Sequence, residues 1–185
     1  MTTQFEHNLE NLKSKLLLMG QLANDSLQGA IKALVEGDSV LAKAVRTKDE
    51  EIDDLENELS EEVTTFLSTH APVASDLRLL VSIIKISHEV ERIGDEAKAI
   101  ARRSRKTVIP DFHRIPRMGE IAREMIQDAL SIFVEYDENQ AKAIWTRDLE
   151  VDQLHKENNQ FCQSLVEKDP RLRPRSLKCF LFQNH

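Results

Sequence analysis

The residues best suited to chemistry are an acidic pair with a histidine three positions before it. Glu91 and Asp95 are four positions apart, so on a helix both carboxylates lie on one face, and His88 shares that face. Two like charges placed in this way repel by roughly 0.2–0.5 kcal/mol, and a cation or an arginine would turn that repulsion into attraction. Carboxylate oxygens suit Mg, Mn or Fe, and a nearby imidazole adds Zn. Gly94 removes a side chain between the two acids and would let an ion or another backbone approach.

The same spacing also has an ordinary explanation. Acidic pairs four positions apart recur eight other times in the chain, so the spacing alone is weak evidence for a metal site. From periodicity, His88, Glu91 and Asp95 lie nearly opposite the apolar stripe of their helix and are expected to face solvent. They would form either an ordinary polar face or a surface metal site. The expected stripe comprises Leu79, Ile83, Ile86, Val90, Ile93, Ala97 and Ile100.

A second acidic region precedes this pair. The segment from Asp49 to Glu62 holds nine acidic residues and no basic one, which indicates a solvated acidic face or, alternatively, a surface for a cation or a partner. Within it, Asp49 and Asp53 are expected to form salt bridges between helices. The same role is expected for Asp148 and Asp152, their counterparts in the repeat described below.

Long amphipathic helices must position these residues. Apolar residues recur in alternating steps of four and three along the first third of the chain, which predicts a helix that packs against other long helices. Gly37 and Pro72 interrupt the pattern, and Asp38 or Ser39 can cap the helix that follows the first break. The expected helices cover about residues 5–35, 39–69 and 75–105.

The third of these helices is apolar almost all round in its first half, so it is expected to lie inside a bundle. At its start, Asp76 could cap an early turn, and Arg78 could pair with acidic neighbours. Both are therefore expected to be structural or partner-contact residues rather than catalytic ones.

The pattern then begins again. A shift of 99 residues lays residues 118–152 over residues 19–53, and fifteen of these 35 positions are identical without a gap. The repeat predicts two tandem three-helix units, residues 1–107 and residues 108–185. The third helix of the second unit is expected to start near Arg175 and to run to about position 204, so the second unit is predicted to lack most of its last helix. Trp145 replaces Arg46 in the repeat and is expected to pack locally or at an interface.

Composition supports an all-α fold, an up-and-down helical bundle. Only five Gly, five Pro and 5% aromatic residues are present, which disfavours a turn-rich sheet protein. A net charge of −7 makes nucleic acid an unsuitable partner. No signal peptide or membrane-inserting segment is expected, so the cytoplasm is the expected location. Phosphate-binding loops, dinucleotide fingerprints, paired-His zinc motifs and nucleophilic motifs do not occur in the sequence, and no enzymatic activity is expected.

Several of these segments resemble the PhoU family. The run from Pro72 to Ala101 resembles its signature, with the order Ala-Ser-Asp-Leu-Arg at residues 74–78 and Glu-Arg-Ile-Gly-Asp at residues 91–95. The AKAVRTKDEEID run of the second helix and the tandem arrangement of two three-helix units are also similar to the family. The resemblance covers almost the whole chain up to about Asp169.

The resemblance implies a regulator. Family members are associated with the phosphate ABC transporter and its sensor histidine kinase, and they damp phosphate-starvation signalling when phosphate is plentiful. It therefore implies contacts with the transporter's ATPase subunit and with the kinase, a peripheral position at the inner face of the membrane, and a homodimer. Arg92, within the signature, is a candidate for partner contact.

The resemblance also implies a metal site. Some family members bind metal clusters, and the matching residues here are Glu91 and Asp95, with a cluster of Fe, Zn, Mn or Mg as cofactor. Glu96 stands where the family often has His, and the second motif would fall near position 190. Two alternatives remain: a metal-binding bundle without transporter partners, or a non-functional remnant of a longer chain.

Overall fold

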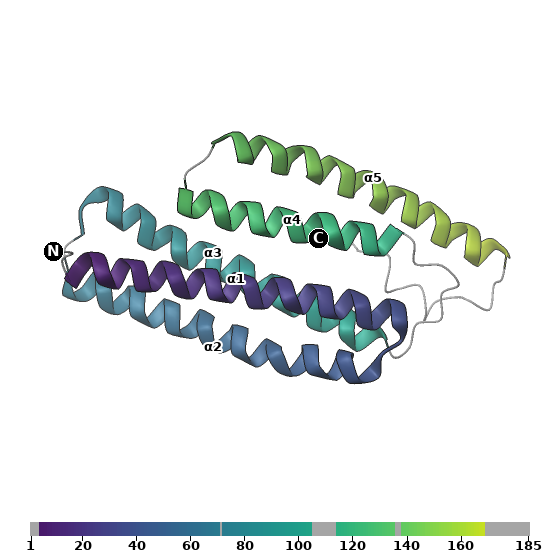
Figure 1. Ribbon diagram of the computed structural model, residues 1–185, viewed down its shortest axis with the longest axis horizontal. Coiled ribbons are helices and arrows are strands. Elements are labelled where there is room, and N and C mark those ends of the chain that lie inside the picture. Colours follow the sequence, from purple (N-terminus) through teal and green to yellow (C-terminus); the bar gives the residue numbers. More distant parts are fainter. Residues whose placement is uncertain (1–3, 71, 105–113, 136–137, 169–185) are drawn as a thin grey trace.

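The computed structural model describes residues 4–70, 72–104, 114–135 and 138–168. These residues form long helices that run up and down along one axis (Figure 1). No strand occurs in the described residues, and none of their helices has an apolar run long enough to cross a bilayer. The all-α, up-and-down prediction is therefore confirmed. The helices are α1 (Gln4–Glu36), α2 (Ser39–Thr69), α3 (Ala74–Ser104), α4 (Arg114–Glu135) and α5 (Glu138–Lys168).

The turn between α1 and α2 has the residues that its geometry requires. Gly37 adopts a φ of 67°, a left-handed conformation that costs glycine little. Asp38 then caps α2, because its carboxylate accepts hydrogen bonds from the backbone N–H groups of Val40 and Leu41 at 2.8 and 3.0 Å. The predicted cap is confirmed at Asp38.

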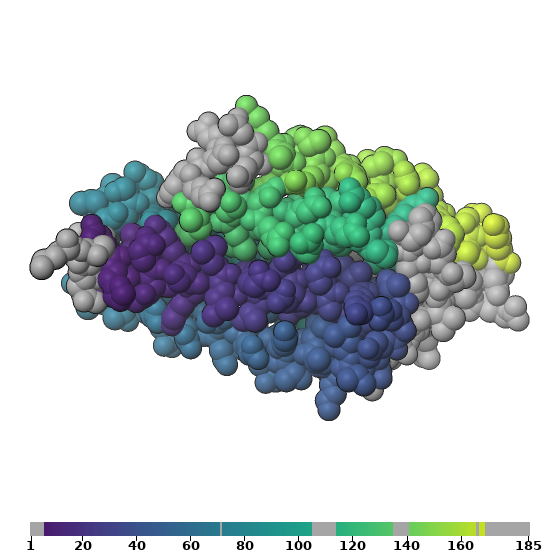
Figure 2. Space-filling model, in the orientation of Figure 1, coloured from purple at the N-terminus to yellow at the C-terminus, as the bar shows by residue number. Residues whose placement is uncertain are grey.

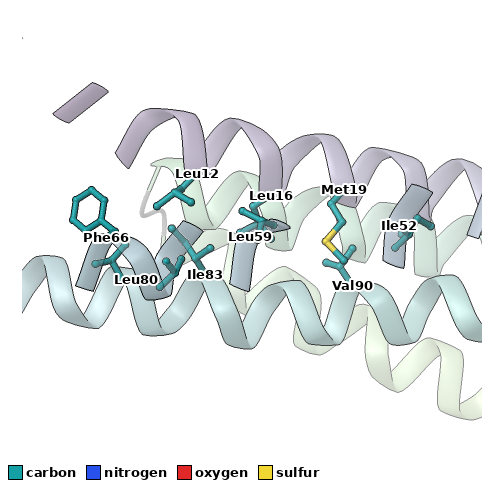
Figure 3. Packing of buried hydrophobic residues seen from close by; sticks show 11 residues of the cluster. Leu12, Leu16, Met19, Ile52, Leu59, Phe66, Leu80, Ile83 and Val90 are labelled. Atoms are coloured by element: carbon teal, nitrogen blue, oxygen red, sulfur yellow. The ribbon is translucent and has the colours of Figure 1, made fainter. Parts of the chain in front are cut away.

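Helices α1, α2 and α3 share a continuous apolar core (Figure 3). Side chains from all three helices meet along its length, and Leu16, Met19 and Ile52 are completely buried. Burying a large apolar side chain stabilises a fold by about 1.5–3 kcal/mol, so this core dominates the stability of the first unit. The buried members are Leu12, Leu16, Met19, Ala23, Ile52, Leu59, Val63, Phe66, Leu80, Ile83 and Val90.

The face that α3 turns toward this core differs from the predicted stripe. Ile86, Ile93 and Ile100 are only half-buried. Ile83, Val90 and Ala97 were predicted correctly, and each of the other stripe positions has its buried residue one position later in the chain. Many of the residues on this core face are small, which lets the helices approach closely. The residues that α3 buries are Leu80, Ile83, Ser87, Val90, Gly94, Ala97, Ala101 and Ser104. The expectation that the first half of α3 is buried all round is also wrong, because Leu77 and Val81 are exposed.

Helices α1 and α4 pack antiparallel through two equivalent contacts (Figures 1 and 2). A Cβ atom on Gly20 would lie 2.3 Å from Leu130 Cδ1, and one on Gly119 would lie 2.1 Å from Ile31 Cδ1. Gly119 and Leu130 are the copies, 99 positions on, of Gly20 and Ile31. Each contact is thus the counterpart of the other, as a two-fold axis between two related helices requires. The division of the whole chain at residue 107 remains a prediction.

Candidate functional site

Several of the predicted site residues meet along the seam between α2 and α3, around a buried aspartate. Asp49, on α2, has a side chain only 2% exposed and forms an ion pair with Lys98 of α3. Lys98 Nζ also lies 3.7 Å from Asp95 Oδ1, one turn earlier on its own helix. The hydrogen bond to Asp49 raises the pKa of Lys98 and so holds it in the charged form. The predicted salt bridge between helices is therefore present at Asp49.

Glycine at position 94 allows α2 and α3 to approach at this point. A Cβ atom there would lie 3.0 Å from Ile52 Cδ1 and 3.6 Å from Asp49 Oδ1. Side chains of α2 thus fill the space beside Gly94, where the sequence analysis allowed an ion or another backbone to approach.

Glu91 is closer to the core than its predicted solvent-facing position. Its side chain is 21% exposed, because the true core face of α3 includes Ser87 and Gly94, one turn before and one turn after it. The side chains of His88 and Asp95 are 64% and 59% exposed, so both face solvent as predicted. His88 Nδ1 lies 3.6 Å from Glu56 Oε1 and 4.0 Å from Glu91 Oε2, so the imidazole bridges the two helices.

The seam holds more negative charge than its basic residues balance. Burial raises the pKa of Glu91, and the nearby Asp95, Asp53 and Glu56 carboxylates raise it further, against the opposing effect of His88. Burial is also the main reason why the pKa of Asp53 is raised, followed by repulsion from Asp49. A cation placed beside these carboxylates would relieve the repulsion.

The arrangement nevertheless falls short of a built metal centre. Within the described ranges, no three His, Cys, Asp or Glu side chains converge so that they could hold a metal ion. Lys98 already provides a positive charge between Asp49 and Asp95. The chemistry of the donors suits a divalent cation, but the geometry offers it a pair of carboxylates rather than an enclosing set of ligands.

The remaining predicted residues lie away from this seam. Asp76 is half-buried in the first turn of α3, and Arg78, two positions later, is exposed. Arg92 is exposed and forms an ion pair with Glu89 at 2.8 Å. The remaining two acids, Asp148 and Asp152 on α5, are both exposed.

Sequence reasoning did not identify Lys98 as part of the site. A signal for it existed at Asp49, which falls at core spacing between Val45 and Ile52 of α2. A charged residue in the middle of an apolar stripe indicates a buried ion pair, and the basic partner then has to come from a neighbouring helix.

Comparison with known proteins decides the family. The PhoU domain matches residues 16–104 and again residues 115–182 of this chain. This chain belongs to the PhoU family. A PhoU homolog of Pseudomonas putida, named a phosphate-specific transport system accessory protein, is 36% identical over 176 residues, covering 92% of this chain and 69% of the relative.

Solved PhoU structures share the fold. The crystal structure of PhoU from Pseudomonas aeruginosa superposes with a TM-score of 0.89 at 34% identity, covering 96% of this chain and 87% of that one. The PhoU regulatory protein of the phosphate transport system from Streptococcus pneumoniae gives a TM-score of 0.83 at 25% identity, covering 90% and 80%. The resemblance drawn from the signature at residues 72–101 is thus confirmed, and a role connected with phosphate transport follows from it.

Proposed function

We propose that this chain is a negative regulator of phosphate uptake and of phosphate-starvation signalling, acting through protein contacts rather than catalysis. In this proposal it binds the ATPase subunit of the phosphate ABC transporter and the phosphate sensor histidine kinase at the cytoplasmic face of the membrane. It acts as a homodimer. One observation carries the proposal: relatives named phosphate-specific transport system accessory proteins align over nearly the whole chain.

The charge of α2 supports a role in protein contacts. Exposed acidic residues line this helix. A surface with one sign of charge attracts a partner that carries the opposite charge.

Replacement of a relative in cells tests the proposal. The chain is expressed in a bacterium whose own PhoU has been deleted, and a reporter of phosphate-starvation genes is measured in phosphate-rich medium. Restored repression, together with recovery of the ATPase subunit and the kinase in a pull-down, is expected. Full derepression with neither partner recovered, while a full-length relative succeeds in both assays, would favour the non-functional remnant instead.

A second candidate function is weak binding of a divalent metal at Glu91 and Asp95. The raised pKa of Glu91, caused by burial and by neighbouring carboxylates, favours it. Protein purified without chelator is compared with the Glu91→Gln/Asp95→Asn variant by elemental analysis for Fe, Zn, Mn and Mg. A lower metal content in the variant is expected, whereas equal content would assign these residues to an ordinary polar face.

A further inference from the structure

Basic side chains bridge acidic pairs at two places in this fold, each time from a neighbouring helix. Lys15 of α1 lies between Glu58 and Glu62 of α2, with its Nζ atom 2.6 Å from Glu58 Oε2 and 2.7 Å from Glu62 Oε1. In both places the two acids are one helical turn apart, so a single cation reaches both carboxylates and joins two helices. The second bridge is formed by Arg147 of α5 with Glu124 and Asp128 of α4.

Lys98 has the corresponding role at the seam between α2 and α3. Its ammonium group forms the ion pair with buried Asp49 and lies 3.7 Å from Asp95 Oδ1, so it is placed between carboxylates of two helices. Asp53, one turn after Asp49, is influenced by the same charge. Burial and then Asp49 raise the pKa of Asp53, and Lys98 opposes both effects. One ammonium group therefore offsets the charge of three carboxylates.

The position of Lys98 Nζ also has the properties of a place for a small divalent cation. Carboxylates from two helices face it, and the Lys98 side chain is 29% exposed, so water reaches its surroundings. Mg²⁺ binds proteins through one or two carboxylates and keeps several waters, and Mn²⁺ prefers the same ligands. Two carboxylates beside solvent are thus a sufficient protein contribution, without the enclosing set of ligands that this seam lacks.

The ammonium group and a divalent ion exclude each other at this position, because two positive charges at one place repel strongly. The hydrogen bond from Lys98 to Asp49 raises the pKa of Lys98, so the lysine remains charged at neutral pH. Asp49 is 2% exposed, and a buried carboxylate without a cation is strongly destabilising. An incoming ion would therefore have to displace Lys98 from its only buried partner.

We propose that Lys98 takes the place of a divalent metal ion between Asp49 and Asp95. It determines the specificity of this place: with Lys98 present the seam excludes Mg²⁺ and Mn²⁺ from it, and without Lys98 the two carboxylates bind one of these ions. This inner place depends on Asp49, which separates it from the weak outer binding considered above for Glu91 and Asp95.

Removal of the lysine charge tests the proposal. Lys98→Gln retains an amide that can donate a hydrogen bond to Asp49, and Lys98→Arg, which keeps the charge, is the matched control. Mn²⁺ binding is measured from the electron paramagnetic resonance signal of the free ion. Lys98→Gln is expected to bind Mn²⁺ at least about tenfold more tightly than the parent chain. Its melting temperature should also rise more with added Mn²⁺ than that of the parent, whereas Lys98→Arg should behave as the parent does.

Second substitutions in the Lys98→Gln chain locate the ion. Asp49→Asn should abolish the gain in Mn²⁺ affinity, and Glu91→Gln should leave it in place. Equal affinities of Lys98→Gln and the parent, or a Lys98→Gln chain that Mn²⁺ does not stabilise, would overturn the proposal. A gain that survives Asp49→Asn but is lost with Glu91→Gln would overturn it too, and would support the outer metal site at Glu91 and Asp95 instead.

Discussion

Asp49 and Asp148 occupy the same position of the repeat, yet one is buried against Lys98 and the other is exposed. The local sequences around them are similar, with a Thr two positions before each and an Asp four positions after. The difference arises from the third helix. In α1–α3 it covers the apolar faces of its neighbours, and across α4 and α5 the described residues provide no equivalent. Burial in this fold is thus a property of the assembled unit rather than of each helix.

The largest difference between the two units is expected in their cores. Ile52→Ala removes a completely buried side chain and should lower the free energy of unfolding by about 2–5 kcal/mol. The copy of Ile52 is Val151, which is only half-buried, so Val151→Ala should cost roughly 0.5–1 kcal/mol. Urea unfolding followed by circular dichroism measures both. Equal losses would mean that the second unit is covered as completely as the first.

The buried ion pair should give the next largest difference. Asp49→Asn removes the charge that Lys98 faces and should destabilise by about 1.5–3 kcal/mol, since one charge then loses its partner. Asp148→Asn should change the stability by less than about 0.5 kcal/mol, as for other surface substitutions. Thermal unfolding at neutral pH compares the two variants. A large loss at Asp148 would reveal a basic partner on α5's exposed side.

An alanine pair tests the same contrast by adding volume. Ala30 is packed in a cluster of small residues with Ala33, Ala42 and Ala97, so Ala30→Leu should cost about 1–3 kcal/mol through overpacking. The copy, Ala129, is exposed, and Ala129→Leu should be close to neutral. Hydrogen exchange of the two variants against the parent chain is a suitable measurement. Faster exchange throughout residues 114–135 in Ala129→Leu would contradict the comparison.

Sequence periodicity predicted the fold more reliably than it predicted which face of α3 is buried. The helices follow from their apolar spacing, and the cap at Asp38 follows from its position after Gly37. The buried face of α3 was predicted only in part, because the large residues Ile86 and Ile93 line a hollow between α3 and α4 instead of the core. The closest helix packing is at small residues such as Gly94 and Ala101. A pattern of hydrophobic residues does not identify them, because small residues are only weakly hydrophobic.

The candidate site was predicted in part. The carboxylates of Glu91 and Asp95 are on one face of α3, as their spacing requires, and Asp49 forms the expected bridge between helices. Lys98 and the bridging position of His88 depend on the register of α2 against α3. This register cannot be predicted from a single sequence, because the close packing of α3 against α2 at Gly94 determines it.

The smallest expected difference concerns Asp53 and its copy Asp152. The pKa of Asp53 is raised by burial and by repulsion from Asp49, one helical turn away, while Asp152 is exposed. An acid whose pKa is higher in the folded chain than in the unfolded chain binds more protons when folded, so its ionisation destabilises the fold as pH rises. The penalty is complete at pH values above the folded pKa and disappears below the unfolded value of about 3.9.

Asp53→Asn should therefore stabilise the protein at pH 7, by roughly 0.2–0.5 kcal/mol, the repulsion of a like-charged pair one turn apart. The gain should shrink as the pH is lowered through the folded pKa of Asp53 and vanish below about pH 3, where the carboxyl of the parent chain is largely protonated in both the folded and the unfolded state. Chemical unfolding at several pH values between about 3 and 7 measures this, with Asp152→Asn as the matched control. Because Asp152 is exposed, its variant should show no such pH-dependent gain. A gain that grows toward acid pH in Asp53→Asn would mean that Lys98 stabilises the Asp53 carboxylate more than burial and Asp49 oppose it.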